Sequence, residues 1–391
     1  MIEFGLTPNH IFKNLTYQRN DFKEIENKNC RYQICNSYNN CNNKDCEINI
    51  INNNNNFICD DFQYIKIIEV PYYKVKLFII CLSVVYCFEI EKKKDKKEDS
   101  ELYSLENLIK YDLIKIKFRM GNYNKRKIPI LLLGKGEFIV MGGLYNGNII
   151  IQKLNKDNNS FDIEILDNST YPINNIIIDK KENYSICSNL KGSIFIYQIN
   201  KNEKNKWNIY KEINDCYSEI LSMNLNEKLN IFVTYSNNNL CMIYTFPKFK
   251  LVNSFKLYDE FNEEIQANKF LISFSPLSSY LFYSERKKQF YVYSINGEKI
   301  LEKKTDYLND IQIFTNSYSQ DFVYFYEIEN KNIKIYSMPY LDEIHSFNLK
   351  CDCDIFDMDI SDDKSFIVIL NKENNEKKFN IKLFKYKKTK I

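Results

Sequence analysis

The segment Asn183-Tyr-Ser-Ile-Cys-Ser-Asn-Leu-Lys-Gly-Ser-Ile-Phe-Ile-Tyr197 contains two apolar strands joined by a short polar turn. Similar segments recur every 42 to 51 residues and begin at Glu137, Leu229, Tyr280, Phe322 and Ser365. Four short strands with their turns need about 40–50 residues, so this period predicts the blades of a β-propeller.

The second strand of each repeat ends in an aromatic or amide side chain: Gln152, Tyr197, Tyr244, Tyr293, Tyr336 and Phe384. The apolar residues before it alternate, which is typical of a strand with one face turned inward. Residues 77–90 add a seventh copy. We therefore predict an all-β, seven-bladed, WD-repeat-like β-propeller over residues 61–391, with a charged insertion and connector at 91–127.

The chain has 391 residues, of which 44% are hydrophobic, so it is long enough to bury a large core. Its 54 basic and 51 acidic residues nearly balance, and the net charge of +3 gives no global field that would attract nucleic acid or an anionic membrane. The longest apolar run, at 77–88, is shorter than the ~20 residues of a membrane-spanning helix. No segment reads as a signal peptide, so we expect the twelve cysteines to be reduced thiols in the cytosol.

Three segments outside the repeats carry weaker patterns. Thr7-Pro8, followed by apolar residues at 11 and 12, predicts a short helical tail within residues 1–21. Residues 22–60 are rich in Asn with little apolar periodicity, which predicts a loosely held low-complexity insertion. Apolar residues fall on one side of a helix drawn through 102–110, so we predict a short helix there.

The start of the chain resembles the motif that closes BEACH domains, commonly written Phe-Gly-Gln-Thr-Pro-x-Gln-Leu-Phe. The matching residues are Phe4, Gly5, Thr7, Pro8, Ile11 and Phe12, with Arg19 beyond them. Leu6 replaces the family's Gln, and Leu15-Thr16-Tyr17 replaces its Pro-His-Pro. In neurobeachin-like proteins this motif leads into a C-terminal WD-repeat propeller. The resemblance implies that residues 1–21 are the tail of a BEACH domain whose body lies in the same or a larger chain. Either Met1 is internal to a larger product or a split gene has kept the propeller alone, and we expect the former.

Three short motifs farther along are similar to segments of neurobeachin-like propellers. Gly142-Gly143-Leu-Tyr145 resembles their Gly-Gly-x-Trp, and Ser294-Ile-Asn296-Gly297 resembles their Ser-Ile-Asn-Gly. Asp359-Ile-Ser361-Asp-Asp363 resembles their Asp-Leu-Ser-x-Asp. The resemblance implies a structural or interaction role for these residues, and each match also fits ordinary turn chemistry.

The sequence offers little for catalysis or metal binding. His10 and His345 are its two histidines, and no nucleophile, base and acid can be assembled around either. The spacing of Cys30, Cys35, Cys41 and Cys46 is looser than a zinc knuckle, and Cys351-Asp-Cys-Asp354 offers two thiols too close together, so we expect free thiols at both places. We predict no enzyme activity, no cofactor and no metal.

The usual marks of a WD repeat, a Gly-His pair and a terminal Trp-Asp, are missing from every repeat. Trp207 is the one tryptophan, and its position suggests a place between the third and fourth blades. The blades must therefore be held together by apolar packing of Ile, Phe, Tyr and Val.

These observations favour a non-enzymatic scaffold that binds protein partners through propeller loops. The BEACH resemblance implies a role in vesicle trafficking or membrane dynamics, in the cytoplasm or peripherally on endomembranes. A phosphoinositide-binding propeller is an alternative, but its Phe-Arg-Arg-Gly mark is reduced to Phe118-Arg-Met-Gly121. An RNA-associated propeller would fit the basic and aromatic stretch Lys382–Lys388, although we expect no nucleic acid as a partner.

Overall fold

The computed structural model describes residues 47–50, 62–70, 74–81, 84–94, 101–112, 129–143, 147–154, 163–167, 169–201, 206–227, 229–258, 269–272, 280–284, 289–304, 311–314, 322–327, 332–348, 353–360, 366–373 and 379–385. Within these ranges the chain forms β-strands that pair into seven four-stranded sheets. Neighbouring strands in every sheet are antiparallel, as in a meander.

Six of these sheets are built from four consecutive strands, and the seventh combines the last three strands with β1; we number the sheets in chain order. Sheet 1 contains β2 (Phe62–Val70), β3 (Lys74–Cys81), β4 (Val84–Lys94) and β5 (Glu101–Asp112). Sheet 2 contains β6 (Ile130–Leu133), β7 (Phe138–Gly142), β8 (Ile149–Lys153) and β9 (Ile163–Leu166). Sheet 3 contains β10 (Ile173–Ile178), β11 (Tyr184–Asn189), β12 (Ile194–Asn200) and β13 (Lys206–Ile213).

Sheet 4 contains β14 (Ile220–Asn226), β15 (Ile231–Ser236), β16 (Leu240–Thr245) and β17 (Leu251–Lys256). Sheet 5 contains β18 (Lys269–Ile272), β19 (Tyr280–Ser284), β20 (Gln289–Tyr293) and β21 (Lys299–Lys304). Sheet 6 contains β22 (Ile311–Phe314), β23 (Phe322–Glu327), β24 (Asn332–Ser337) and β25 (Asp342–Asn348). Sheet 7 contains β26 (Cys353–Ile360), β27 (Phe366–Glu373), β28 (Phe379–Lys385) and β1 (Glu47–Ile50).

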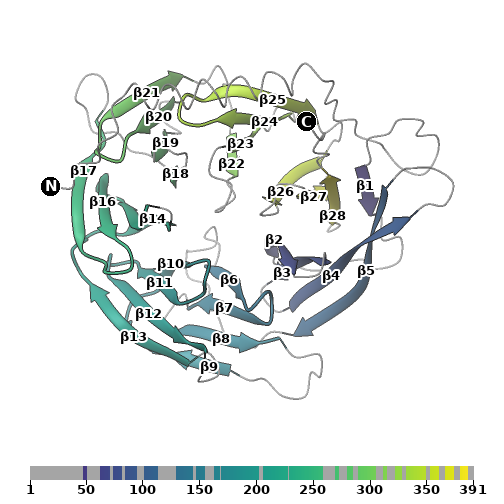
Figure 1. Ribbon diagram of the computed structural model, residues 1–391, viewed down its shortest axis with the longest axis horizontal. Helices are drawn as coiled ribbons and strands as arrows, with labels where there is room; N and C mark the ends of the chain where they lie inside the picture. The colour runs from purple at the N-terminus through teal and green to yellow at the C-terminus, as the bar shows by residue number, and fades with distance from the viewer. Residues whose placement is uncertain are drawn as a thin grey trace.

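The sheets are arranged around a central axis, with the first strand of each sheet innermost and the last strand outermost (Figure 1). The two-strand repeats predicted from the sequence coincide with the middle strands of the sheets, from β3–β4 to β27–β28. Those middle strands are the most deeply buried: all six residues of β15 are buried, for example. Strands buried on both faces read as continuous apolar runs, which is why these repeats were visible in the sequence.

The sequence predictions need correction at three places. Residues 102–110 form part of β5 rather than a helix. β5 carries one extra residue opposite Cys87 and Glu89 of β4, and such a bulge interrupts the strict alternation that would have marked the segment as a strand. Strands β4 and β5 also extend into the charged insertion expected at 91–127.

The second correction concerns residues 22–60. Residues 47–50 of that segment form β1, which pairs with β28 from Glu47 opposite Phe384 to Ile50 opposite Ile381. Sheet 7 thus joins strands that are far apart in the sequence, and such pairing covers an edge of β28 that would otherwise be open. The third correction is Trp207, which lies in β13 of sheet 3 and packs against Tyr197 with ring centroids 5.7 Å apart and ring planes tilted by 46°. The predicted helical tail lies outside the described residues.

The tyrosine that closes the predicted repeat lies in the third strand of several sheets and is buried against the neighbouring sheets. Its exposed fraction is 1% at Tyr197, 0% at Tyr244, 4% at Tyr293 and 7% at Tyr336. In each of these sheets the outer strand has one extra residue opposite this position. The bulge places apolar side chains on the outer rim, among them Tyr210, Val252 and Ile300.

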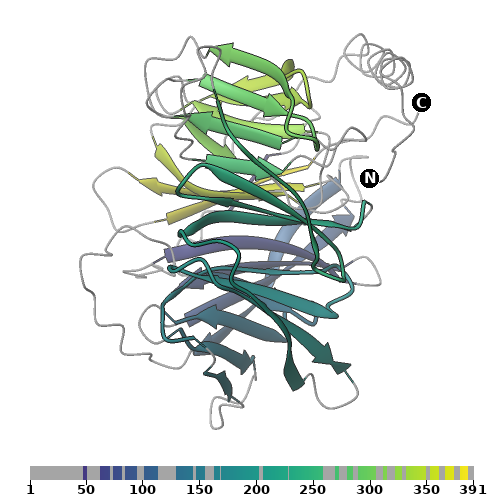
Figure 2. The same ribbon diagram turned by 90° about the vertical axis from the view of Figure 1, so that its left-hand side faces the viewer.

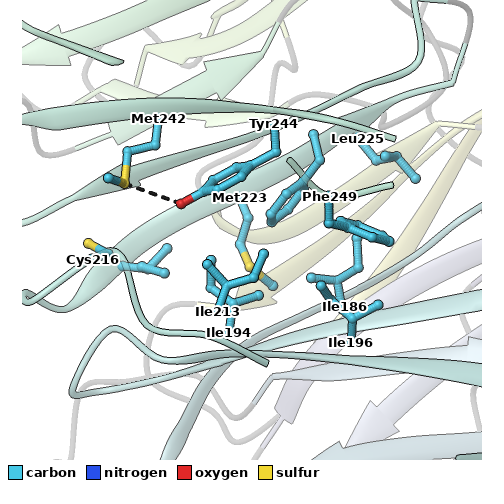
Figure 3. Close-up of a cluster of buried hydrophobic side chains, with 12 residues drawn as sticks. Ile186, Ile194, Ile196, Ile213, Cys216, Met223, Leu225, Met242, Tyr244 and Phe249 are labelled. Atoms are coloured by element: carbon cyan, nitrogen blue, oxygen red, sulfur yellow. Dashed lines mark hydrogen bonds between the residues drawn. The ribbon is translucent and has the colours of Figure 1, made fainter. Parts of the chain in front are cut away.

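The core lies between adjacent sheets rather than within one. A cluster of buried side chains from sheets 3 and 4 includes Ile186, Ile196, Leu225, Met242 and Tyr244, and the Tyr244 hydroxyl donates a hydrogen bond of 3.3 Å to Sδ of Met242 (Figure 3). Apolar packing of this kind takes the place of the missing WD-repeat marks.

One turn is built in the same way in sheets 4 and 6 and packs against the preceding sheet. Phe249, after β16, and Leu341, after β24, both have positive φ, of 50° and 51°, and both are 1% exposed. The carbonyl of Phe249 accepts a hydrogen bond of 2.5 Å from Nζ of Lys211, and that of Leu341 accepts one of 2.6 Å from Nζ of Lys303. Each lysine comes from the outer strand of the preceding sheet, so these turns connect sheet 4 to sheet 3 and sheet 6 to sheet 5.

Candidate interaction face

The strands run from one face of the ring to the other, so their turns gather on two faces (Figure 2). We call one of them the connector face: it carries the turns between the second and third strands of each sheet and the connections from one sheet to the next. The opposite face carries the remaining turns, and we call it the hairpin face. The two faces differ in side-chain chemistry.

Three exposed tyrosines lie in three successive connections of the connector face. Tyr171 lies between sheets 2 and 3, Tyr217 between sheets 3 and 4, and Tyr258 directly after the last strand of sheet 4. Their exposed fractions are 43%, 93% and 41%. Tyrosine combines a large apolar area with a hydroxyl, and it is over-represented in protein interfaces. The three side chains make this face a candidate binding surface.

Hydrogen bonds hold the backbone around Tyr171. Ser169 Oγ donates to the Tyr171 carbonyl at 2.8 Å and accepts from the Tyr171 amide at 3.1 Å. Asn189 Nδ2 donates to the same hydroxyl at 2.9 Å, and the Leu190 amide donates to the Pro172 carbonyl at 3.0 Å. The first connection is therefore tied to the adjacent turn of sheet 3.

The backbone around Tyr217 is held by close packing as well. Gly192, with φ of +95°, approaches this connection so closely that a Cβ atom would lie 2.3 Å from the Ser218 carbonyl oxygen and 2.4 Å from that of Cys216. Cys216, which is 3% exposed, donates from Sγ to the Ser218 carbonyl at 3.2 Å. The ring of Tyr217 thus projects into solvent from a fixed backbone.

The inner strands tie this connection to the wall of the ring. Nδ2 of Asn174 and Nδ2 of Asn175 donate to the carbonyl of Ile220 at 2.6 and 2.7 Å. Ser188 Oγ donates to Oδ1 of Asn174 at 2.8 Å and accepts from Asn175 Nδ2 at 3.1 Å. These buried amide contacts fix the start of β14, and with it the position of the connection before it.

The charges on the connector face are mainly negative. In the described turns and connections of sheets 2 to 4, this face carries the carboxylates of Asp167, Asp215 and Glu219 and one ammonium group, that of Lys191. Nζ of Lys191 lies 5.3 Å from the centre of the Tyr171 ring, a cation–π contact. Burial raises the pKa of the Tyr244 hydroxyl, and the charge of Asp215 raises it further.

The hairpin face of the same sheets carries more lysines, and three of its carboxylates accept hydrogen bonds from backbone amides. Glu182 Oε1 accepts from the Gly134 amide at 2.9 Å, and Glu227 Oε1 accepts from the Lys180 amide at 2.5 Å, so each glutamate joins the first turns of two adjacent sheets. Asp179 Oδ1 accepts from the amides of Asn183 and Tyr184. These contacts give the carboxylates a structural role.

The residues singled out from the sequence do not form one site. Gly142 lies against Pro129 and Ile173 with no room for a Cβ, and the Gly143 amide donates to the Asn148 carbonyl at 2.6 Å. Asn296 and Gly297 form a turn on the hairpin face of sheet 5, where Gly297, with φ of +86°, packs on the ring of Phe255. Asp359 lies in β26 opposite Val368. Phe4, Gly5, Thr7, Pro8, Phe12, Arg19, Tyr145, Ser361 and Asp363 lie outside the described residues.

No group of three or more metal-ligating side chains occurs in the described part of the chain. The cysteines at 30, 35, 41 and 46 lie outside it, and His345 is placed in β25 opposite Ile335. The thiols of Cys87, Cys187, Cys216 and Cys241 are buried. Burial raises the pKa of the Cys187 thiol to about 12, which keeps it protonated and weakly nucleophilic. The described part of the chain contains no helix that is long and apolar enough to cross a membrane.

A search of solved structures finds the chain similar to the WD40 β-propeller domain of Doa1, with a TM-score of 0.50 and 10% sequence identity over 84% of this chain and 97% of that one. This likeness shows the fold: the chain is an all-β protein of the WD40 propeller type. No family model and no curated protein sequence matches the chain.

The three connector tyrosines were not found from the sequence, although a signal was present. They are spaced 46 and 41 residues apart, close to the repeat period, and each follows the last strand of its sheet. Side chains that recur in one connection of a repeat protein fall on one face.

Proposed function

We propose that this protein is a non-enzymatic scaffold in which the seven sheets are the blades of one closed ring, and that partner proteins bind its connector face. The observation that carries the proposal is the row of exposed Tyr171, Tyr217 and Tyr258 on backbone that the structure holds in place. Binding then needs little ordering of the scaffold itself, because the connections around Tyr171 and Tyr217 are already fixed.

Tyrosine suits this role for physical reasons. Its ring buries a large area at the cost of few rotatable bonds, and its hydroxyl can hydrogen-bond to a partner's backbone. The exposed apolar residues of the outer strands are a poorer basis for binding, because the bulge repeated in several outer strands accounts for three of them. Surface hydrophobic residues scattered singly are normal in soluble proteins.

The test is affinity purification of the tagged full chain from native cells, followed by quantitative mass spectrometry. The variant Tyr171→Ala/Tyr217→Ala/Tyr258→Ala should lose most of the partners that the wild type retains. The matched control is Ile165→Ala/Val252→Ala, which removes two rim side chains of 55% exposure each. Equal loss in both variants, or retention in both, would show that the connector face is not the binding surface.

A narrower proposal rests on the sequence resemblance alone: the scaffold is part of a BEACH-type protein that acts in vesicle trafficking or membrane dynamics, in the cytoplasm or peripherally on endomembranes. It is tested by immunoblotting native material with an antibody against the propeller. A band far above 46.9 kDa, together with co-purification of vesicle-coat or tethering proteins, would support it. A band near that mass, with neither class of protein present, would argue against it.

A further inference from the structure

The connector face contains a cation–π contact in one connection and a ring with no such cover in the next. The two connections can be aligned through their glycines. Gly147 packs against the carbonyls of Ser169 and Tyr171, and Gly192 packs in the same way against those of Cys216 and Ser218. Ser169 and Cys216 also make the same contact, each donating to the carbonyl two residues ahead.

This alignment shows how the second connection differs. Ser218 stands where the first connection has Tyr171, and Asn238, in the next turn along the ring, stands where sheet 3 has Lys191. The ammonium–ring pair is therefore missing. Tyr217 instead presents its ring one residue earlier, at 93% exposure.

The second connection is also more negatively charged than the first. The turn beside it has no lysine, and the connection itself has carboxylates two residues before and two residues after Tyr217 in the sequence, at Asp215 and Glu219. Asp215 is exposed, and its charge reaches the buried hydroxyl of Tyr244 beneath the connection. An exposed aromatic ring two residues from an exposed carboxylate offers a cation both a ring face and a negative charge.

We infer that Tyr217 receives an arginine or lysine side chain from a segment of the partner protein, held by the ring face and by Asp215. This inference deepens the proposed function and depends on it. Arginine is the better occupant, because its planar guanidinium stacks on an aromatic ring and can also hydrogen-bond to a carboxylate. The Lys191 contact on Tyr171 shows a cation bound to an aromatic ring on this same face.

The experiment measures fluorescence anisotropy of a short labelled peptide, in which arginine alternates with serine, titrated with the full chain. A twin peptide with citrulline in place of arginine keeps the shape and removes the charge. Exposed cation–π contacts and surface ion pairs each contribute modestly, so Tyr217→Ala should weaken binding of the arginine peptide roughly two- to fivefold, and Asp215→Asn by a similar factor. Tyr217→Phe should bind about as tightly as the wild type.

A gain-of-binding variant keeps the test independent of folding. Lys191→Gln removes the ammonium group from the Tyr171 ring, so it should strengthen binding of the arginine peptide by about twofold or more. The citrulline twin should bind more weakly than the arginine peptide and should not respond to Tyr217→Ala. Equal binding of the two peptides, or equal affinity for wild type, Tyr217→Ala and the rim control Ile165→Ala, would overturn the inference.

The outcomes also separate this inference from the function on which it rests. If the triple tyrosine variant loses its cellular partners while the arginine peptide ignores Tyr217, the scaffold role stands and the cationic occupant is wrong. If the peptide depends on Tyr217 and Asp215 while cellular partners are retained, the cation site stands and the wider binding face is wrong.

Discussion

Replacing Phe249 with alanine should be among the most destabilising changes in sheets 3 and 4. The side chain is 1% exposed, and its ring contacts those of Phe232, Phe246 and Tyr184 at centroid distances of 5.6 to 6.0 Å. Removing a buried Phe side chain from a packed core costs about 3–5 kcal/mol. Unfolding entropy is about 2.1 cal/mol/K per residue, so a chain of this length should lose about 1.2 °C of Tm per kcal/mol, or about 4–6 °C in all.

The assay is thermal unfolding followed by circular dichroism, with Lys248→Ala as the control because Lys248 is the exposed neighbour and should change stability by about 0.5 kcal/mol or less. Phe249→Gly adds a second arm. Glycine normally costs more than alanine, but Phe249 has φ of 50°, where glycine is unstrained, so the glycine variant should be no less stable than the alanine variant. A Tm change below about 1 °C for Phe249→Ala would refute the view that this turn holds sheet 4 to sheet 3.

Three further changes test other parts of the account. Leu341→Ala removes the equivalent side chain of sheet 6 and should cost about 2–5 kcal/mol by urea denaturation; a loss equal to that of an exposed control such as Asp342→Ala would contradict the equivalence of the two turns. Gly192→Ala places a Cβ 2.3 Å from the Ser218 carbonyl, so it should lower Tm and also weaken partner capture, whereas Lys191→Ala should leave Tm nearly unchanged. Burial raises the pKa of the Cys187 thiol from 9.0 to about 12, so its stabilising contribution is complete below pH 9 and is lost as pH rises toward 12. Between pH 8 and pH 10 the urea midpoint should therefore fall less in Cys187→Ala than in the wild type, by the equivalent of about 1 kcal/mol. An equal fall in the two proteins would contradict the raised pKa.

The sequence was sufficient to predict the middle strands of the sheets, because their signal is local. In β11 and β12 an apolar run, a turn with Gly192 and a second apolar run define a hairpin without any other part of the chain. The inner and outer strands were harder to predict. β10 has two asparagines among its isoleucines, and their amides are satisfied by Ser188 and by Ile220 of the next sheet, contacts that only the folded ring supplies.

The outer strands were obscured by their bulges. The extra residue in β5 lies between the pairs at Glu106 and Ile109 and interrupts the alternation of its side chains, and the sequence alone does not show where such a bulge falls. The candidate site was missed for a related reason. Tyr217 carries no local sequence mark of its 93% exposure, and the close approach of Gly192 to the carbonyls of Cys216 and Ser218 is a contact between segments that only the folded chain shows.

The residues chosen by resemblance had a different outcome. Gly142 and Gly297 are explained by close packing, against Pro129 and Ile173 in one case and against Phe255 in the other. A match in a short motif around a turn glycine is therefore better evidence for a similar turn in two proteins than for a similar binding partner.

The central claim, that partners bind the connector face, is tested most directly by site-specific photo-crosslinking in native cells. A benzophenone amino acid placed at Tyr217 samples the connector face, and the same group placed at Ile165 samples the rim, both at positions more than half exposed. The account predicts discrete crosslinked products from position 217 that Asp215→Asn diminishes, and few or none from position 165. Discrete products from position 165 alone would contradict the claim and place the binding surface on the outer strands.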